Sequence, residues 1–215
     1  MAGRKCDMTV IYAVSFGVDG EGDLAKGKLS EAAHAGLEVG ARAARLWQRT
    51  FGSFEDGTPF FVLAIEFVDR LAMANYSAKT HVTSAFDRVH SRVVASELPL
   101  ERGPKEERGS VLEVELTRPV PGRWRDALQA SQNGADFHHL AGAVDCRLWH
   151  LDIGGIHSRH LVFCAQYADL HSWSTGREDA IRHPDTRSKA ALMLSSDPPL
   201  LELRSDVFCE VHSWS

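Results

Sequence analysis

The chain has 215 residues, 44% hydrophobic and 25% charged, a composition typical of a globular protein with its own core. Its formal net charge of −5 and the lack of Lys/Arg-rich runs lead us to expect no nucleic-acid partner. The sequence contains no apolar stretch of 18 residues, so we expect no membrane span. The four cysteines lack C-x-x-C spacing, and no apolar signal core precedes the first strand pattern. We therefore expect reduced thiols and a cytoplasmic location, although Cys146 and Cys164 could lie opposite each other across a hairpin.

The first half of the chain alternates between strand and helix patterns. Met8 to Phe16 is a predicted strand, and Gly17 to Gly22 is a turn. Apolar residues then recur at helical spacing until Gly40, which is a plausible helix stop. The remaining elements are two strands, a helix and a weak, proline-interrupted edge strand, predicted at Ala43–Phe51, Phe60–Phe67, Leu71–Ser91 and Val93–Leu100.

The second half repeats the same order after a charged linker from Glu101 to Gly109. Its predicted elements are Ser110–Thr117, Arg123–Ala141, Cys146–Ile153, His160–Tyr167, Leu170–Leu194 and Leu200–Val211. Pro184 is expected to interrupt the helix that starts at Leu170. Each half therefore reads β-α-β-β-α-β, the order of the ferredoxin-like split unit.

The two halves also share residues. Arg45-Leu46-Trp47 returns as Arg147-Leu148-Trp149, and Phe61 to Asp69 matches Leu161 to Asp169. This internal repeat predicts two units, residues 1–103 and 104–215. A ferredoxin-like sheet carries helices on one face only, so each unit needs a cover for its bare face. We expect an α+β fold in which two tandem ferredoxin-like units form an intramolecular dimeric-type α/β barrel, with Trp47 and Trp149 in equivalent places.

The repeat unit resembles the dimeric α/β-barrel superfamily. The resemblance is carried by the R-L-W strand, by the hairpin into an apolar strand that ends in Phe67-Val68-Asp69 or Tyr167-Ala168-Asp169, and by the helix that follows. NIPSNAP-like and antibiotic-biosynthesis-monooxygenase-like units look most similar. The resemblance implies a cofactor-independent oxygenase or a haem-binding relative as activities to consider. It also implies pocket residues on the second helix of the first unit, where Asn75, Tyr76 and His81 are the candidates.

Strand alternation predicts which side chains face the enclosed space. The apolar positions of the first strands, Val10/Tyr12/Val14 and Leu112/Val114/Leu116, are expected beneath the helices. The alternate positions then point inward, and the predicted wall contains Glu66, Gln166, Glu113, Glu115, Ser15, Trp47, Trp149, Arg45 and Arg147. A buried carboxylate with a raised pKa could act as a general base, which makes Glu66 and Glu115, with His81, the catalytic candidates. Structural ion pairs between the sheets, and core packing of the tryptophans, are the alternatives.

Eight of the eleven histidines lie in the second unit, several of them around its hairpin. No H-E-x-x-H or two-histidine, one-carboxylate spacing occurs, so no metal site is expected. A haem would need an axial ligand, and nothing in the sequence selects among His81, His138, His139, His171 and His183.

We therefore predict that the barrel binds or transforms a small, mostly apolar molecule without a cofactor, as an oxygenase or a proton-transfer enzyme. A non-catalytic binding or stress-related protein and a haem-binding relative remain alternatives. The expected partner is a small-molecule ligand, with neither nucleic acid nor membrane, and the chain is expected to be a pseudo-twofold monomer or a homodimer.

Overall fold

The computed structural model describes residues 9–17, 22–52, 60–79, 89–101, 108–153, 160–184 and 198–215. Within these residues the first half contains β1 (Val10–Gly17), α1 (Gly22–Glu38), β2 (Ala41–Gly52), β3 (Phe60–Phe67), α2 (Arg70–Lys79) and β4 (Val89–Leu98). The second half contains β5 (Val111–Pro119), α3 (Trp124–Leu140), β6 (Asp145–Ile153), β7 (Leu161–Tyr167), α4 (Leu170–Arg182) and β8 (Leu200–Trp214). The order β-α-β-β-α-β therefore occurs twice, as predicted.

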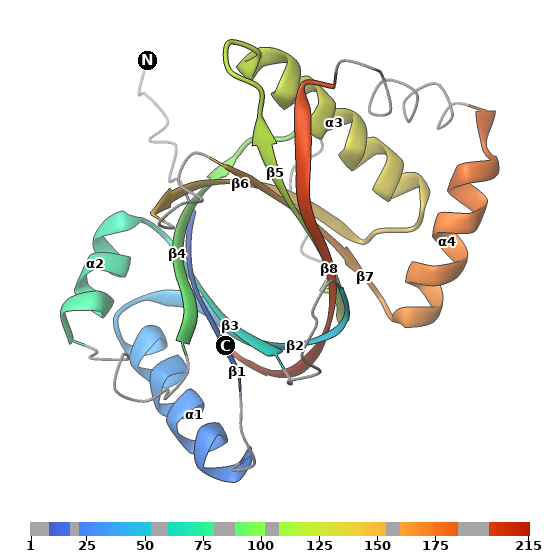
Figure 1. Cartoon of the computed structure of the whole chain (residues 1–215). Coiled ribbons are helices and arrows are strands. Elements are labelled where there is room, and N and C mark those ends of the chain that lie inside the picture. Colours follow the sequence, from blue (N-terminus) through green and yellow to red (C-terminus); the bar gives the residue numbers. More distant parts are fainter. Residues whose placement is uncertain are drawn as a thin grey trace, which may run out of the picture.

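The strands close into one barrel in the order β1-β3-β2-β8-β5-β7-β6-β4, and all neighbours are antiparallel. Helices α1 and α2 lie outside the barrel beside the first half, and α3 and α4 lie outside it beside the second (Figure 1). The predicted α+β fold, an intramolecular α/β barrel, is confirmed. The predicted unit boundary at residues 103 and 104 lies outside the described residues and stays a prediction.

The last strand of each half joins the sheet of the other half. Strand β8 pairs with β2 as well as β5, and β4 pairs with β6 as well as β1. Equivalent strands of the two halves are four places apart in the barrel, so they run in the same direction. A pseudo-twofold axis therefore runs along the barrel axis, and equivalent residues lie at the same end. Trp47 lies opposite Glu210 and Trp149 opposite Glu97, in equivalent registers.

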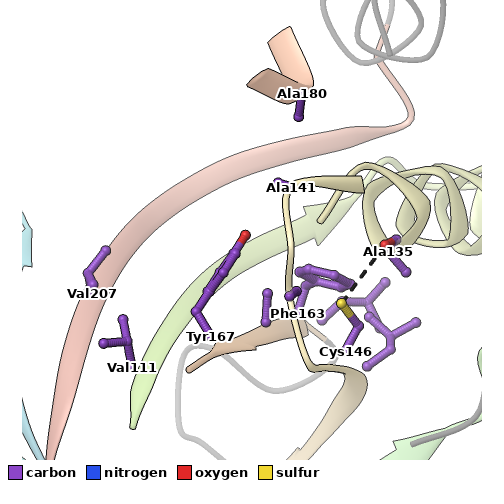
Figure 2. Close-up of a cluster of buried hydrophobic side chains, with 12 residues drawn as sticks. Val111, Ala135, Ala141, Cys146, Phe163, Tyr167, Ala180 and Val207 are labelled. Atoms are coloured by element: carbon purple, nitrogen blue, oxygen red, sulfur yellow. Dashed lines mark hydrogen bonds between the residues drawn. The ribbon is translucent and has the colours of Figure 1, made fainter. Parts of the chain in front are cut away.

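Each half has its own core between the sheet and its helices. In the first, Leu46, Leu63 and Phe67 pack against α1 and α2. In the second, Leu148, Phe163 and Tyr167 belong to the cluster beneath α3 and α4, and Figure 2 shows Phe163 and Tyr167 there with Cys146. The predicted inner and outer faces of the second and third strands are thus confirmed.

Glycines end the first helix of both halves. Gly40 and Gly142 adopt φ of +97° and +86°, the left-handed conformation that glycine tolerates best. The predicted stop at Gly40 is confirmed, because α1 ends at Glu38.

Two predictions about the end of the first half are wrong. The helix expected to reach Ser91 does not, because β4 begins at Val89. Strand β4 is also not an edge strand, since it pairs on both sides to close the barrel.

Cys146 and Cys164 do not face each other. Cys146 lies opposite Ala165, and Cys164 lies opposite Arg147, so the two thiols point to opposite faces of the sheet. Cys164 and Cys209 are free thiols.

Candidate functional site

The inner faces of the strands enclose a space that we call the lumen. Two apolar clusters border it, and both are built from strands alone. One surrounds Trp47 and Phe208, and the other surrounds Ala95, Trp149 and Leu151. The inward positions of Trp47 and Trp149 agree with the predicted wall.

Side-chain burial shows that the lumen is not filled. Along β7, Leu161, Phe163, Ala165 and Tyr167 are buried under the helices, whereas Val162, Cys164 and Gln166 are partly exposed. Strand β3 alternates in the same way, with Val62, Ala64 and Glu66 partly exposed. Because the sheet is closed, the accessible surface of these inward side chains faces the lumen. The lumen therefore keeps space that a water-sized molecule can reach, bounded by mostly apolar walls.

Arg49, Asp206 and Arg204 form ion pairs at inward positions of β2 and β8. Two further polar clusters lie at one end of the lumen, and we call the first the Arg45 cluster. Arg45 donates hydrogen bonds from Nη1 to Gln166 Oε1 (2.8 Å) and from Nη2 to the Gly109 carbonyl (2.6 Å), and it pairs with Glu210. Its guanidinium also lies over the Trp47 ring, 4.2 Å from the centroid. Arg45 thus reaches from the first half into the second.

The Arg147 cluster is the pseudo-symmetric counterpart. Arg147 donates from Nη1 to Glu66 Oε2 (3.1 Å) and from Nε to Asp145 Oδ2 (2.9 Å), so it reaches from the second half into the first. Glu97, opposite Trp149, is the fourth member. Burial alone would lower the pKa of Arg147, but the charges of Glu66, Asp145 and Glu97 outweigh it and hold that pKa above its usual value.

Glu97 has a pKa above its usual value. Burial raises its pKa, and the charges of Glu66 and Asp145 raise it further, against the opposing effects of Arg147 and a hydrogen bond with Thr9. An acid with a raised pKa is a stronger base when it is ionised, which suits it to accept a proton.

The carboxylates of β5 lie on the other side of the sheet from the lumen, and their predicted inward position is wrong. Glu113 accepts a hydrogen bond from Trp173 Nε1 (2.9 Å) and pairs with Arg177, both on α4. Glu115 Oε1 lies 3.7 Å from Nε2 of His138 on α3. Burial raises the pKa of Glu115, but its hydrogen bond with His138 and the charge of that histidine outweigh this and lower it.

The error has a simple cause. Val10 lies opposite Phe67 and Val111 opposite Tyr167, so Val10 corresponds to Val111 and not to Leu112. Leu112, Val114 and Leu116 accordingly border the lumen, as does Ile11 in the first half. A one-residue offset in a strand moves every side chain to the opposite face.

The candidates on the second helix do not reach the lumen. Tyr76 is buried under α1, where its hydroxyl donates to the Ala32 carbonyl (3.3 Å) and its ring contacts Phe67. Asn75 is exposed on the outside of α2. Their predicted place in a pocket is therefore not what the structure shows. His81 and the side chain of Ser15 lie outside the described residues.

Sequence reasoning missed Glu97 and Glu210. One feature of the sequence could have identified both residues, because each half has a glutamate in its last strand. The misreading of β4 as an edge strand hid the first of them, because an edge strand would not line a lumen.

Neither a family model nor a curated protein matches the chain. Solved structures match over nearly its whole length at low identity. A candidate monooxygenase from Fusobacterium nucleatum subsp. nucleatum has a TM-score of 0.67 at 9% identity, covering 97% of this chain and 94% of that one. An anthrone oxidase-like protein has a TM-score of 0.58 at 12% identity, covering 98% and 94%. A mutant chlorite dismutase from Candidatus Nitrospira defluvii has a TM-score of 0.55 at 8% identity, covering 94% and 91%.

These similarities show the dimeric α/β-barrel fold. They do not single out NIPSNAP-like or antibiotic-biosynthesis-monooxygenase-like units. In the described part of the chain, no helix is long and apolar enough to cross a bilayer.

The prediction that the barrel uses no cofactor is contradicted by this comparison. The chlorite dismutases among the neighbours are haem proteins. Within the described residues, no three or more His, Cys, Asp or Glu side chains converge as they would around a metal ion.

A histidine that ligates a haem iron needs a ring nitrogen with a free lone pair. His138 does not offer one, because its Nδ1 bonds the Tyr167 hydroxyl (2.7 Å), its Nε2 faces Glu115, and aromatic rings pack around it. His139 fits better. Its Nδ1 lies 3.2 Å from the Ala143 carbonyl, which can only accept, so Nε2 carries the lone pair. That Nε2 is buried and has no hydrogen-bond partner among the described residues.

Proposed function

We propose that the chain binds a small, mostly apolar aromatic molecule in the lumen and removes a proton from it at the Arg147 cluster. The observation that carries this proposal is the raised pKa of Glu97 at the end of an apolar, incompletely filled lumen. Trp47 and Trp149 offer flat apolar surfaces for an aromatic ring.

The chemistry assigns one role to each polar group. The C–H or O–H bond of the ligand breaks, its proton passes to the Glu97 carboxylate, and the electron pair stays on the ligand. Arg147 stabilises the anion that forms, as a fixed positive charge in a site of low dielectric. Glu66 and Asp145 hold the Arg147 side chain in place through their hydrogen bonds.

The neighbours support this class of reaction. One is named as anthrone oxidase-like and another as a candidate monooxygenase. An oxygenase whose substrate must first lose a proton needs a base of this kind.

Anthrone is a suitable probe, because its methylene protons exchange with deuterium in D2O once a base removes them. The exchange would be followed by NMR without oxygen, and binding by quenching of tryptophan fluorescence. We expect the protein to bind anthrone and to speed exchange, and Glu97→Gln to keep binding but lose roughly 100-fold or more of the exchange rate.

Glu31→Gln, which removes an exposed carboxylate on α1, is the matched control and should change neither value. Full exchange activity in Glu97→Gln would refute the assigned base. A wild-type protein that does not bind anthrone or other polycyclic aromatic molecules would refute the lumen as a ligand site.

The haem proteins among the neighbours and the free Nε2 of His139 favour a second candidate function, haem binding with His139 as axial ligand. When bound, a haem would supply redox chemistry at its iron. Titration of the protein with haemin should produce a shifted Soret band, and His139→Ala should abolish that shift. An unchanged spectrum in His139→Ala would exclude this ligand.

The location and assembly of the chain complete the proposal. We retain a cytoplasmic location, which the free thiols of Cys164 and Cys209 support. The barrel closes within one chain, so a monomer suffices to form the lumen. Light scattering after size exclusion would distinguish a monomer from a homodimer.

A further inference from the structure

An open pocket lies outside the Arg45 cluster. It has a volume of about 520 Å³, and its lining consists of Arg45, Arg108, Gly109, Ser110, Glu210, Val211, His212 and Ser213. Arg45 is shared between this pocket and the lumen, because its guanidinium covers the Trp47 ring that borders the lumen. The pocket therefore adjoins the lumen at Arg45.

Arg45, which lines the pocket, has one hydrogen-bond donor without a partner among the described residues. Arg45 Nη1 donates to Gln166, and Nη2 donates to the Gly109 carbonyl and to Glu210. Its Nε is buried and has no hydrogen-bond partner among the described residues. A buried N–H without a partner is costly, and an acceptor atom of a ligand would satisfy it.

The charges of the two clusters differ in sign. Among the described residues, the pocket at the Arg45 cluster holds two arginines, Arg45 and Arg108, against the single carboxylate of Glu210. The Arg147 cluster and the half-exposed Arg42 near Glu66 set two arginines against three carboxylates. When all these groups are ionised, the first is positive by one charge and the second negative by one. Both lie at the same end of the barrel.

We propose that the pocket at the Arg45 cluster is a subsite for an anionic group of the ligand, such as a carboxylate, because of its positive charge. The apolar body of that ligand lies along Trp47 in the lumen, so this proposal rests on the proposed function. Arg45 Nε and the exposed Arg108 recognise the carboxylate, and the hydroxyls of Ser110 and Ser213 lie in the same pocket. The preferred ligand is therefore an aromatic acid rather than a neutral aromatic molecule.

The test compares 9-anthracenecarboxylate with the neutral 9-anthracenecarboxamide, measured by tryptophan quenching at low salt. The wild-type protein should bind the carboxylate roughly tenfold more tightly than the amide. Arg108→Gln should lose most of that preference, because the change weakens binding of the carboxylate more than binding of the amide. Because Arg108 is exposed, this variant is expected to fold, whereas Arg45→Gln would also break contacts between the halves.

Arg118→Gln is the matched control, since Arg118 is exposed near the opposite end of β5. It should keep the full preference. Equal affinity of the wild-type protein for both compounds would overturn the anionic subsite and leave lumen binding intact. A preference that survives Arg108→Gln would overturn its assignment to this pocket. If neither compound binds, the lumen proposal fails, and the subsite fails with it.

Discussion

The buried network beneath α3 and α4 allows a sharp test of whether Glu113 is structural or functional. Glu113 is 2% exposed and holds Trp173 and Arg177 of α4 against the sheet. In Glu113→Gln the amide oxygen can still accept from Trp173, but the ion pair with Arg177 is lost. A charge-assisted hydrogen bond contributes about 1.5–3 kcal/mol, and the Arg177 side chain is partly exposed, so the unfolding free energy should fall by about 2 kcal/mol.

Urea unfolding followed by circular dichroism would measure this loss, which corresponds to a roughly 30-fold change in the equilibrium constant. Glu115→Gln is the internal comparison. Glu115 is more exposed and its nearest partner, His138, is 3.7 Å away, so its replacement should cost less than about 1 kcal/mol. Aromatic ligands should bind both variants as they bind the wild type. A Glu113→Gln variant of unchanged stability that no longer binds them would refute the structural role.

Three further predictions concern single positions. Gly176→Ala should destabilise the protein by about 1–3 kcal/mol in thermal unfolding, because its new Cβ would lie 1.8 Å from the Ala141 carbonyl oxygen. Gly134→Ala is the control, and it should be neutral or stabilising because there is open space around the added atom. Burial raises the pKa of the Cys164 thiol to about 12, so iodoacetamide should leave it unmodified in native protein at pH 8, and mass spectrometry showing rapid labelling would contradict this. The pKa of Glu97 is raised in the folded state, so the fold loses stability as the pH rises above the pKa that Glu97 has in the unfolded chain. Glu97→Gln should therefore be more stable than the wild type at pH 7 but not at pH 4. Equal urea midpoints at pH 7 would contradict the raised pKa.

The repeat of Arg-Leu-Trp carried most of what could be predicted. It located the second strand of each unit, and its alternation correctly placed Leu46 and Leu148 outside and Trp47 and Trp149 inside. Such strands are readable because their outer faces pack on helices and are uniformly apolar.

The errors arose in strands whose outer faces are not uniformly apolar or whose neighbours were not predicted. Strand β5 has apolar residues toward the lumen and glutamates beneath the helices, the reverse of a simple amphipathic pattern. Glu113 is stabilised there by Arg177 and Trp173 of α4, a tertiary pairing that no local pattern records. The role of Glu97 was hidden for a similar reason, since it depends on the pairing of β4 with β6.

Strands β4 and β8 each pair with a strand of the other half, and this arrangement affects how the barrel could distinguish the two ends of a ligand. A barrel built from two identical chains must present the same groups twice around its axis, so no field can point across its mouth. Here β4 and β8 are parts of one chain and have different sequences. The mouth can carry an electric dipole from the Arg45 side to the Arg147 side, which would orient an asymmetric molecule as it approaches the proposed base.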